Sequence, residues 1–219
     1  TMLAGMAGID FVLLVVAADD GPMPQTIEHL AILDLLGMTR GACVITKCDK
    51  VPAHRVQAVC GDVSNLLSET TLAGAPVLPV ATHEGQGIAE VQAYLALTAR
   101  EHVQPPADGP PRFIIDRAFS IMGSGLVVTG TLVSGRIAVG DRLVVAPGGD
   151  LVRVRGLHAQ NAATDVDVAG ERLGINIAGN NVGVDTVSRG DWLVAPDRIQ
   201  VSHRLDAEVE ILMSEKYPF

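Results

Sequence analysis

The chain has 219 residues, of which 48% are hydrophobic and 3% aromatic, and its 16 basic and 25 acidic side chains give a net charge of -9. This hydrophobic content excludes a disordered chain, and the length allows one large or two modest domains. Residues 1–105 carry 5 Lys/Arg and 11 Asp/Glu, and residues 106–219 carry 11 and 14. Neither half therefore offers the broad basic surface that binds nucleic acid by neutralising its phosphates.

The first hundred residues alternate short apolar runs with helical patterns, which is typical of βαβ units around a parallel sheet. The predicted strands are Phe11–Ala17, Gly41–Thr46 and Pro76–Val80, and the first two have the continuous apolar character of strands covered on both faces. The predicted helices are Gln25–Leu36, His54–Leu67 and Ile88–Arg100. The longest apolar run ends well short of the roughly 20 residues that cross a bilayer, so we expect no membrane partner.

A proline-rich stretch, Val103–Pro111, predicts an extended linker between two domains. The short Val-rich strands after it are separated by glycine-containing turns, which predicts a small closed antiparallel barrel. These strands are Arg112–Ser120, Leu126–Leu132, Arg142–Ala146, Leu151–His158, Arg172–Ala178 and Asp191–Val194. A further strand, Arg204–Leu212, is expected to begin a third domain. The glycines at 123 and 125 precede a strand rather than a helix, so they indicate a turn and not a dinucleotide loop.

The three cysteines form no C-x-x-C pair and have no interleaved histidine ligands. This pattern favours neither a disulfide framework nor a zinc site. We therefore expect a reduced, cytoplasmic protein, with no metal site within this chain.

The tetrapeptide Thr46-Lys47-Cys48-Asp49 directly follows an apolar strand, at the edge where open α/β sheets bind ligands. The Asp49 carboxylate can accept hydrogen bonds from the ring N–H and the exocyclic amine of guanine, while the Lys47 stem packs over the base. Taken alone, the tetrapeptide fits equally well a loop with two solvated charges. The stretch V-A-T-H-E-G at 80–85 follows the third strand and could supply a backbone N–H for guanine O6.

The run M-P-Q-T-I-E-H at 23–29, with the strand and loop before it, resembles the segment that follows switch II in the translational GTPases. The family's guanine motif N-K-x-D then matches residues 46–49, with threonine in place of asparagine. Its S-A-x motif matches residues 80–82, with valine in place of the hydroxyl residue. The resemblance implies a guanine-binding set made of Thr46, Lys47, Asp49, Ala81 and Thr82.

The second half is similar to the selenocysteine-specific elongation factors, a branch of this family related to elongation factor Tu. The similar runs include I-D-R-A-F-S-I-M-G-S-G-L-V-V-T-G-T at 115–131 and G-L-H-A-Q-N at 156–161. The resemblance implies part of an α/β P-loop GTPase domain with a parallel sheet, followed by an antiparallel β-barrel translation-factor domain. The expected boundaries are 1–104 for the GTPase part, 105–111 for the linker, 112–197 for the barrel and 198–219 for the start of a truncated third β domain.

The resemblance further implies a pocket for the selenocysteyl end of a tRNA, made of Asp116, Arg117 and Arg172. A selenol has a pKa well below that of a thiol and arrives as an anion, so guanidinium groups favour it over a neutral serine hydroxyl. The alternative is that Asp116 and Arg117 are an ordinary strand-end pair and that Arg172 is a surface charge.

The sequence contains no G-x-x-x-x-G-K-[ST] phosphate loop. We therefore expect the phosphate loop, the switches and the Mg²⁺ ligands upstream of this chain. The implied parent is a GTPase that uses GTP and Mg²⁺, delivers selenocysteyl-tRNA to the ribosome at recoded stop codons and reads an mRNA hairpin through an absent C-terminal region. The chain alone is expected to be inactive. Two alternatives remain open: a general aminoacyl-tRNA elongation factor of the same family, and a non-catalytic barrel interaction module.

Overall fold

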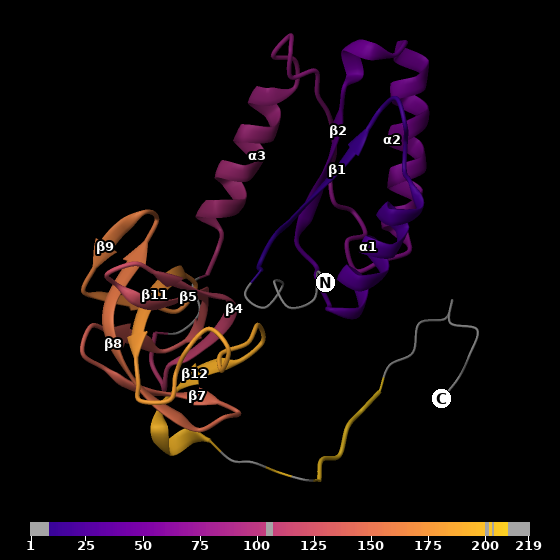
Figure 1. Ribbon diagram of the computed structural model, residues 1–219. Helices are drawn as coiled ribbons and strands as arrows, with labels where there is room; N and C mark the ends of the chain where they lie inside the picture. Colours follow the sequence, from indigo (N-terminus) through magenta and orange to yellow (C-terminus); the bar gives the residue numbers. More distant parts are fainter. Residues whose placement is uncertain (1–8, 104–106, 200–201, 203, 210–219) are drawn as a thin grey trace. The chain divides into compact units, whose positions relative to one another are not determined.

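The computed structural model describes residues 9–103, 107–199, 202 and 204–209 (Figure 1). These residues form two compact units, one made mainly of residues 9–102 and the other mainly of residues 103–206. Each unit is considered by itself below. Residues 104–106 of the predicted linker lie outside the described residues.

The first unit is built on a parallel sheet with the order β1-β2-β3. The strands are β1 (Val12–Ala17), β2 (Gly41–Thr46) and β3 (Val77–Pro79). The helices are α1 (Pro24–Leu35), α2 (Ala53–Ser68) and α3 (Ile88–Arg100), with α2 and α3 on either side of the sheet in Figure 1. All six elements confirm the predictions to within one residue at each end, and a short 3₁₀ turn, η2 (Cys48–Lys50), follows β2.

Burial along the sheet corrects one prediction. β2 is buried from Gly41 to Ile45, as expected for a strand covered on both faces. In β1, by contrast, Leu14 and Val16 are buried, whereas Leu13 and Val15 are 41% and 59% exposed. β1 is one of the two outer strands in the described sheet, and only its Leu14 and Val16 face is covered, so its continuous apolar run was a poor guide to burial.

The start of α1 explains the M-P-Q-T string in physical terms. Pro24 occupies the first helical turn, where a missing N–H costs nothing. The Thr26 hydroxyl accepts a hydrogen bond from the Met23 N–H at 3.2 Å, and the Thr26 N–H donates to the Met23 carbonyl at 2.8 Å. These bonds pair polar groups that a helix terminus otherwise leaves unsatisfied. The loop that leaves β1 therefore enters α1 in a defined direction.

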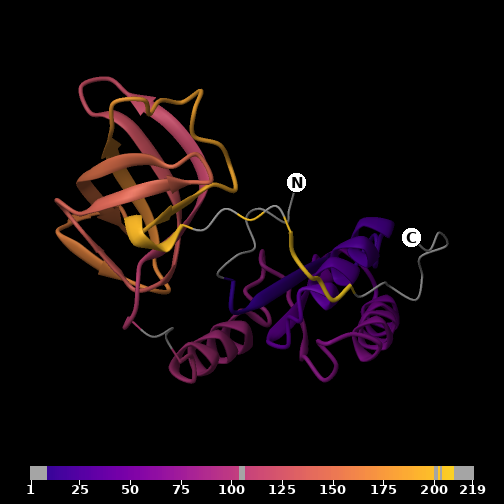
Figure 2. The ribbon, with the colours of Figure 1, turned by 90° about the horizontal axis from the view of Figure 1, so that it is seen from below.

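The second unit is a closed antiparallel barrel of six strands (Figure 2). The ring runs β11-β5-β4-β12-β7-β8 and closes because β11 also pairs with β8. The strands are β4 (Arg112–Ile121), β5 (Gly125–Ser134), β7 (Arg142–Ala146), β8 (Asp150–Ala159), β11 (Arg172–Ala178) and β12 (Trp192–Val194). All six predicted barrel strands are confirmed, and closure leaves no free sheet edge around the ring.

Three short strands were missed. β9 (Ala162–Thr164) pairs antiparallel with the end of β8, while β6 (Arg136–Ala138) and β10 (Val166–Val168) pair with each other. Each has three residues and no two consecutive large apolar side chains, which leaves little pattern to recognise. A 3₁₀ turn, η3 (Pro196–Arg198), follows β12.

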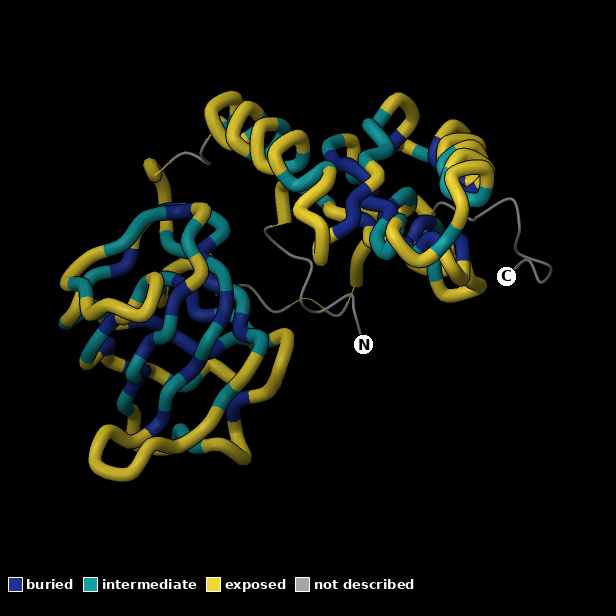
Figure 3. The backbone as a smooth tube through the Cα atoms, turned by 90° about the horizontal axis from the view of Figure 1, so that it is seen from above, coloured by how far each residue is buried: buried dark blue, intermediate teal, exposed yellow. Residues whose placement is uncertain are grey.

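The barrel core comes largely from alternate residues that point inward, most regularly in β5 and β11, and Figure 3 shows this alternation. Phe113, Ile115, Ile175 and Leu193 are fully buried at its centre. Gly123 and Gly125 lie at the turn between β4 and β5 with φ of 84° and 87°, which confirms that they are turn residues.

The end of the described chain differs from expectation. Residues 204–209 contain no strand, so the predicted strand at 204–212 is wrong for these positions, and residues 210–212 lie outside the described residues. Whether a third domain begins at 198–219 stays a prediction. Within the part of the chain that the structure describes, no helix is long and apolar enough to cross a membrane.

Candidate functional sites

Three loops meet at one edge of the parallel sheet. The ends of β1 and β2 pair through Ala17 and Thr46, and β3 joins through Ile45 and Pro79, so the carboxyl ends of all three strands lie together. The residues that follow them are Asp19, Lys47 and Ala81. The structure therefore brings the two predicted guanine segments next to each other, at the edge where parallel sheets bind ligands.

The T-K-C-D loop has a defined backbone shape. Thr46 ends β2, Lys47 has a left-handed φ of 59°, and residues 48–50 form η2. The Cys48 N–H donates to the Val80 carbonyl at 3.2 Å, which ties this loop to the second guanine segment. The Asp49 side chain is exposed, so its carboxylate is accessible to a ligand.

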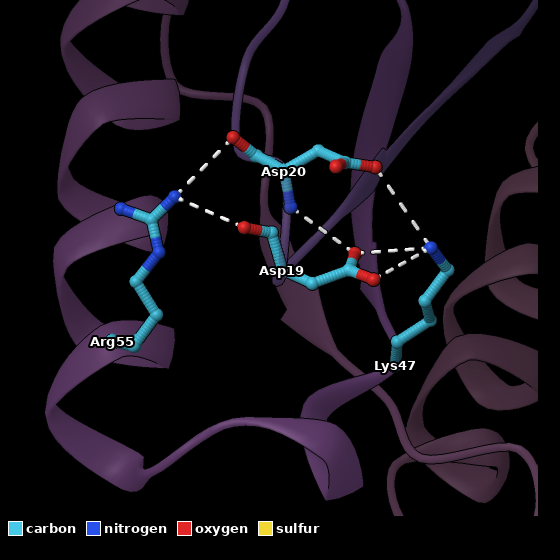
Figure 4. Close-up of polar contacts among 4 residues, drawn as sticks. All are labelled: Asp19, Asp20, Lys47 and Arg55. Carbon is cyan, nitrogen blue, oxygen red and sulfur yellow. Dashed lines mark hydrogen bonds and ion pairs between the residues drawn. The ribbon is translucent and has the colours of Figure 1, made fainter.

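The Lys47 ammonium contacts a carboxylate that sequence reasoning missed. Its Nζ lies 2.8 Å from Oδ2 and 3.0 Å from Oδ1 of Asp19, and 3.8 Å from Oδ2 of Asp20 (Figure 4). The hydrogen bond between Asp19 and Lys47 lowers the pKa of the Asp19 carboxyl and raises the pKa of the Lys47 ammonium. The signal in the sequence was the paired acidic residues directly after the first strand.

The backbone amides of the second guanine segment are arranged differently from the expectation. The buried Ala81 donates its N–H to the Gln86 carbonyl at 3.0 Å, so in this conformation that amide is already engaged. The N–H of the exposed Thr82 has no acceptor among the residues that the structure describes. Of the two amides, that of Thr82 is the one available to a ligand.

The cysteines of this unit are free thiols. Burial raises the pKa of Cys43 to about 12, and it also raises the pKa values of Cys48 and Cys60. Thiols with raised pKa values are poor nucleophiles at neutral pH. Cys48, the variable residue of the guanine motif, donates from Sγ to the Ile45 carbonyl at 3.2 Å.

On the barrel, Asp116 and Arg172 form an ion pair, and the Thr129 hydroxyl donates to Oδ1 of Asp116 at 2.7 Å. The β4–β5 register shifts between Ile115 and Arg117, so Asp116 sits in an irregularity of β4. The Asp116 side chain is only 12% exposed, while that of Arg172 is 60% exposed. Asp116, which is itself held by the Thr129 hydroxyl, thus orients the guanidinium of Arg172. Sequence analysis had not singled out Thr129.

The other predicted residue of this site, Arg117, is exposed and lies in register with Thr129. Its guanidinium makes no ion pair or hydrogen bond with any residue in the described ranges. On the next two strands, Gly174 faces Thr129 and His158 faces Gly174. The four residues form a cross-strand row in the order Arg117, Thr129, Gly174 and His158. Gly174 has no side chain, so it separates Thr129 from His158 in this row.

In the described part of the chain, no group of three or more His, Cys, Asp or Glu side chains is arranged to hold a metal ion. No residue present here is therefore assigned as a ligand of Mg²⁺.

Comparison with known proteins agrees with both units. Residues 1–105 match the elongation factor Tu GTP binding domain, and residues 125–194 match elongation factor Tu domain 2. The selenocysteine-specific elongation factor of Desulfomicrobium baculatum is 39% identical over 99% of this chain and 34% of its own length. That of Escherichia coli (strain K12) is 46% identical over 89% of this chain and 31% of its own length. The chain belongs to the selenocysteine-specific elongation factor family.

Solved structures support this assignment. A bacterial selenocysteine-specific elongation factor superposes with a TM-score of 0.81 and 30% identity, over 90% of this chain and 33% of that chain. The apo form of translation elongation factor SelB from Methanococcus maripaludis gives the same TM-score and identity, over 88% and 41%. The chain spans about a third of the length of the curated relatives described above. Within this family, it matches the α/β GTP binding domain followed by the domain 2 barrel.

Proposed function

We propose that the protein containing this chain is a GTP-dependent elongation factor that carries selenocysteyl-tRNA to the ribosome at recoded stop codons. The observation that carries the proposal is the Asp116–Thr129–Arg172 cluster beside the exposed Arg117 on the barrel, in a chain 46% identical to a selenocysteine-specific factor. The whole protein would act as a GTPase in the cytoplasm and would read an mRNA hairpin through a region outside this chain.

In this proposal, the first unit supplies the guanine-binding half of the nucleotide site. The exposed Asp49 carboxylate accepts hydrogen bonds from the ring N–H and the exocyclic amine of guanine. The Lys47 methylene stem covers one face of the base. A backbone N–H of the Ala81–Thr82 segment donates to O6, and Thr82 is the better candidate because the Ala81 N–H is engaged with Gln86. Thr46 is the last residue of β2 and leads into the loop that carries Lys47 and Asp49.

The barrel supplies the amino acid pocket. A selenolate carries a full negative charge near neutral pH, whereas a serine hydroxyl does not. Asp116 already offsets the charge of Arg172 and fixes its orientation, so Arg117 is the cation left to attract the anion. Charge is therefore the feature that separates selenocysteine from serine in this site.

GTP hydrolysis requires groups that this chain does not provide. Bound Mg²⁺ would offset phosphate charge, and its ligands are expected outside these residues. The contribution of this chain is to select guanine and to hold the aminoacyl end.

The deciding experiment compares the GTP-dependent protection of selenocysteyl-tRNA and seryl-tRNA from deacylation by the full-length protein. The expected result is strong protection of selenocysteyl-tRNA and weak protection of seryl-tRNA, because only the former presents an anion. Equal protection would refute the proposal and favour a general elongation factor. No protection of either would favour a non-catalytic barrel module.

A further inference from the structure

The side chain of Lys47 is fixed at both of its ends. Its backbone adopts a left-handed φ of 59°, which is unfavourable for a residue with a Cβ and persists where the surroundings hold it. At the far end, Nζ bonds both carboxylate oxygens of Asp19. The methylene groups between these two points have few conformations left.

Asp19 is itself held in place by its loop and by α2. The Asp20 N–H donates to Oδ1 of Asp19 at 3.1 Å. From α2, Arg55 Nη2 donates to the carbonyls of Asp19 and Asp20 at 3.4 and 3.3 Å (Figure 4). Gly21 has a φ of +77°, and a Cβ there would lie 3.0 Å from the same Arg55 nitrogen. The loop therefore passes close to the guanidinium and presents the Asp19 carboxylate in a defined direction.

The ion pair between Lys47 and Asp19 adds little to the stability of the fold. The Lys47 and Asp19 side chains are 41% and 36% exposed, and water and salt screen an ion pair that is this exposed. Its effect is geometric. The ammonium is held at the edge of the sheet, on the loop that also carries Asp49.

We propose that Asp19 is a positioning residue of the guanine-nucleotide site, which holds the Lys47 ammonium so that the lysine stem lies ready to cover the face of the base. This inference rests on the proposed function of the first unit. Asp19 does not contact the nucleotide. It acts through Lys47 by removing side-chain freedom that the lysine would otherwise lose on binding.

Asp20 provides a matched control. It carries the same charge on the neighbouring residue, but its carboxylate is 3.8 Å from Lys47 Nζ and its side chain is 62% exposed. Asp20→Asn therefore changes the local charge as Asp19→Asn does, while it leaves the two short hydrogen bonds to Lys47 intact.

The test measures fluorescent-GDP affinity of the full-length protein that carries these residues. Asp19→Asn is expected to weaken GDP binding about fivefold, the upper range for an exposed ion pair. Asp20→Asn should change it less than about twofold. In a Lys47→Gln background, Asp19→Asn should have no further effect, because Asp19 acts through Lys47.

Asp49→Asn separates the two hypotheses. If Asp49→Asn leaves GDP affinity unchanged, the guanine site itself is refuted. If it weakens binding while Asp19→Asn matches the wild type, only the positioning role is overturned, and the same holds if Asp19→Asn acts equally with and without Lys47. Should Asp19→Asn lower the melting temperature, Asp19→Glu decides: GDP affinity close to wild type supports the positioning role, and an affinity as low as that of Asp19→Asn contradicts it.

Discussion

The charged residues of the two candidate sites differ in how far water reaches them. Asp116 is 12% exposed, and its ion pair with Arg172 offsets the charge of that guanidinium. Asp19 and Lys47 are far more exposed, so their contact orients a side chain more than it stabilises the fold. Among the residues that the structure describes, neither Asp49 of the first unit nor Arg117 of the second has a charged partner, so these two are our candidates for contact with ligands.

Asp49→Asn should weaken GDP binding by the full-length protein about 100-fold, because an amide cannot accept both hydrogen bonds that the carboxylate accepts from guanine. Titration with fluorescent GDP measures this change. Xanthosine diphosphate, which carries a carbonyl in place of the exocyclic amine, should bind the variant better than GDP. If both nucleotides weaken equally, Asp49 does not contact the base edge.

Arg117→Gln should reduce the protection of selenocysteyl-tRNA about tenfold and leave that of seryl-tRNA unchanged, since only the selenolate needs a cation. The matched control is Arg155→Gln, which removes an exposed arginine from β8. Deacylation rates with GTP present provide the readout. An equal loss with both variants would show a general charge effect rather than a pocket.

Cys43 should make the fold sensitive to alkali. Burial raises its pKa from 9.0 to about 12, so the native state keeps the thiol protonated while the unfolded chain ionises. The stability due to this group is complete below pH 9 and is lost as the pH rises toward 12. Urea unfolding at several pH values should show a shallower decline above pH 9 for Cys43→Ala than for the wild type. Parallel declines would contradict this assignment.

The barrel depends on a close approach between the backbones of β4 and β5 at Gly130. A Cβ on Gly130 in β5 would collide with the Ile114 carbonyl in β4 and would lie 2.9 Å from the Phe113 ring. β4 and β5 cannot separate without opening the ring, because each is paired on both sides. Glycine at this position is therefore a packing requirement.

Gly130→Ala should destabilise the barrel by about 3 kcal/mol, through overpacking against the backbone. Gly156→Ala in β8 is the matched control, because a Cβ there meets nothing within 4 Å. Its effect should stay within about 0.5 kcal/mol. Chemical denaturation followed by circular dichroism distinguishes the two variants, and equal destabilisation would refute the packing explanation.

At the scale of the whole molecule, this chain spans about a third of the length of its relatives, and in our proposal it carries the base-recognising part of a nucleotide site. Its guanine candidates sit in the first unit and its aminoacyl candidates in the second. A carrier that grips an aminoacyl end through one or two arginines needs no broad basic face, which agrees with the net charge of -9.

The 219-residue chain by itself should bind GDP only weakly, because phosphate and Mg²⁺ contacts supply most of the affinity in such sites. A fluorescent-GDP titration of this chain tests the expectation. Sub-micromolar binding would contradict it and would mean that base contacts alone suffice. The full-length protein, assayed in parallel, controls for the quality of the probe.

Most strands and helices of both units could be predicted from the sequence because they are long enough to show their period. The three-residue strands β3 and β12 were predicted because each contains consecutive large apolar side chains, which β6, β9 and β10 lack. The T-K-C-D loop was identified because its residues are contiguous. Asp19 and Thr129 were missed because their partners, Lys47 and Asp116, lie 28 and 13 residues away. Such pairs depend on strand order and register, which a local pattern does not contain.

The sequence by itself determined the two kinds of unit, the family resemblance and the chemical types of the candidate residues, because those follow from local periodicity and contiguous motifs. Only the tertiary structure decided which charges are already paired. Asp116 offsets Arg172, Asp19 holds Lys47, and Gln86 occupies the Ala81 amide. A side chain's availability to a ligand depends on the groups that folding places within hydrogen-bonding distance of it, and this distance is set by the packing of strands far apart in the chain.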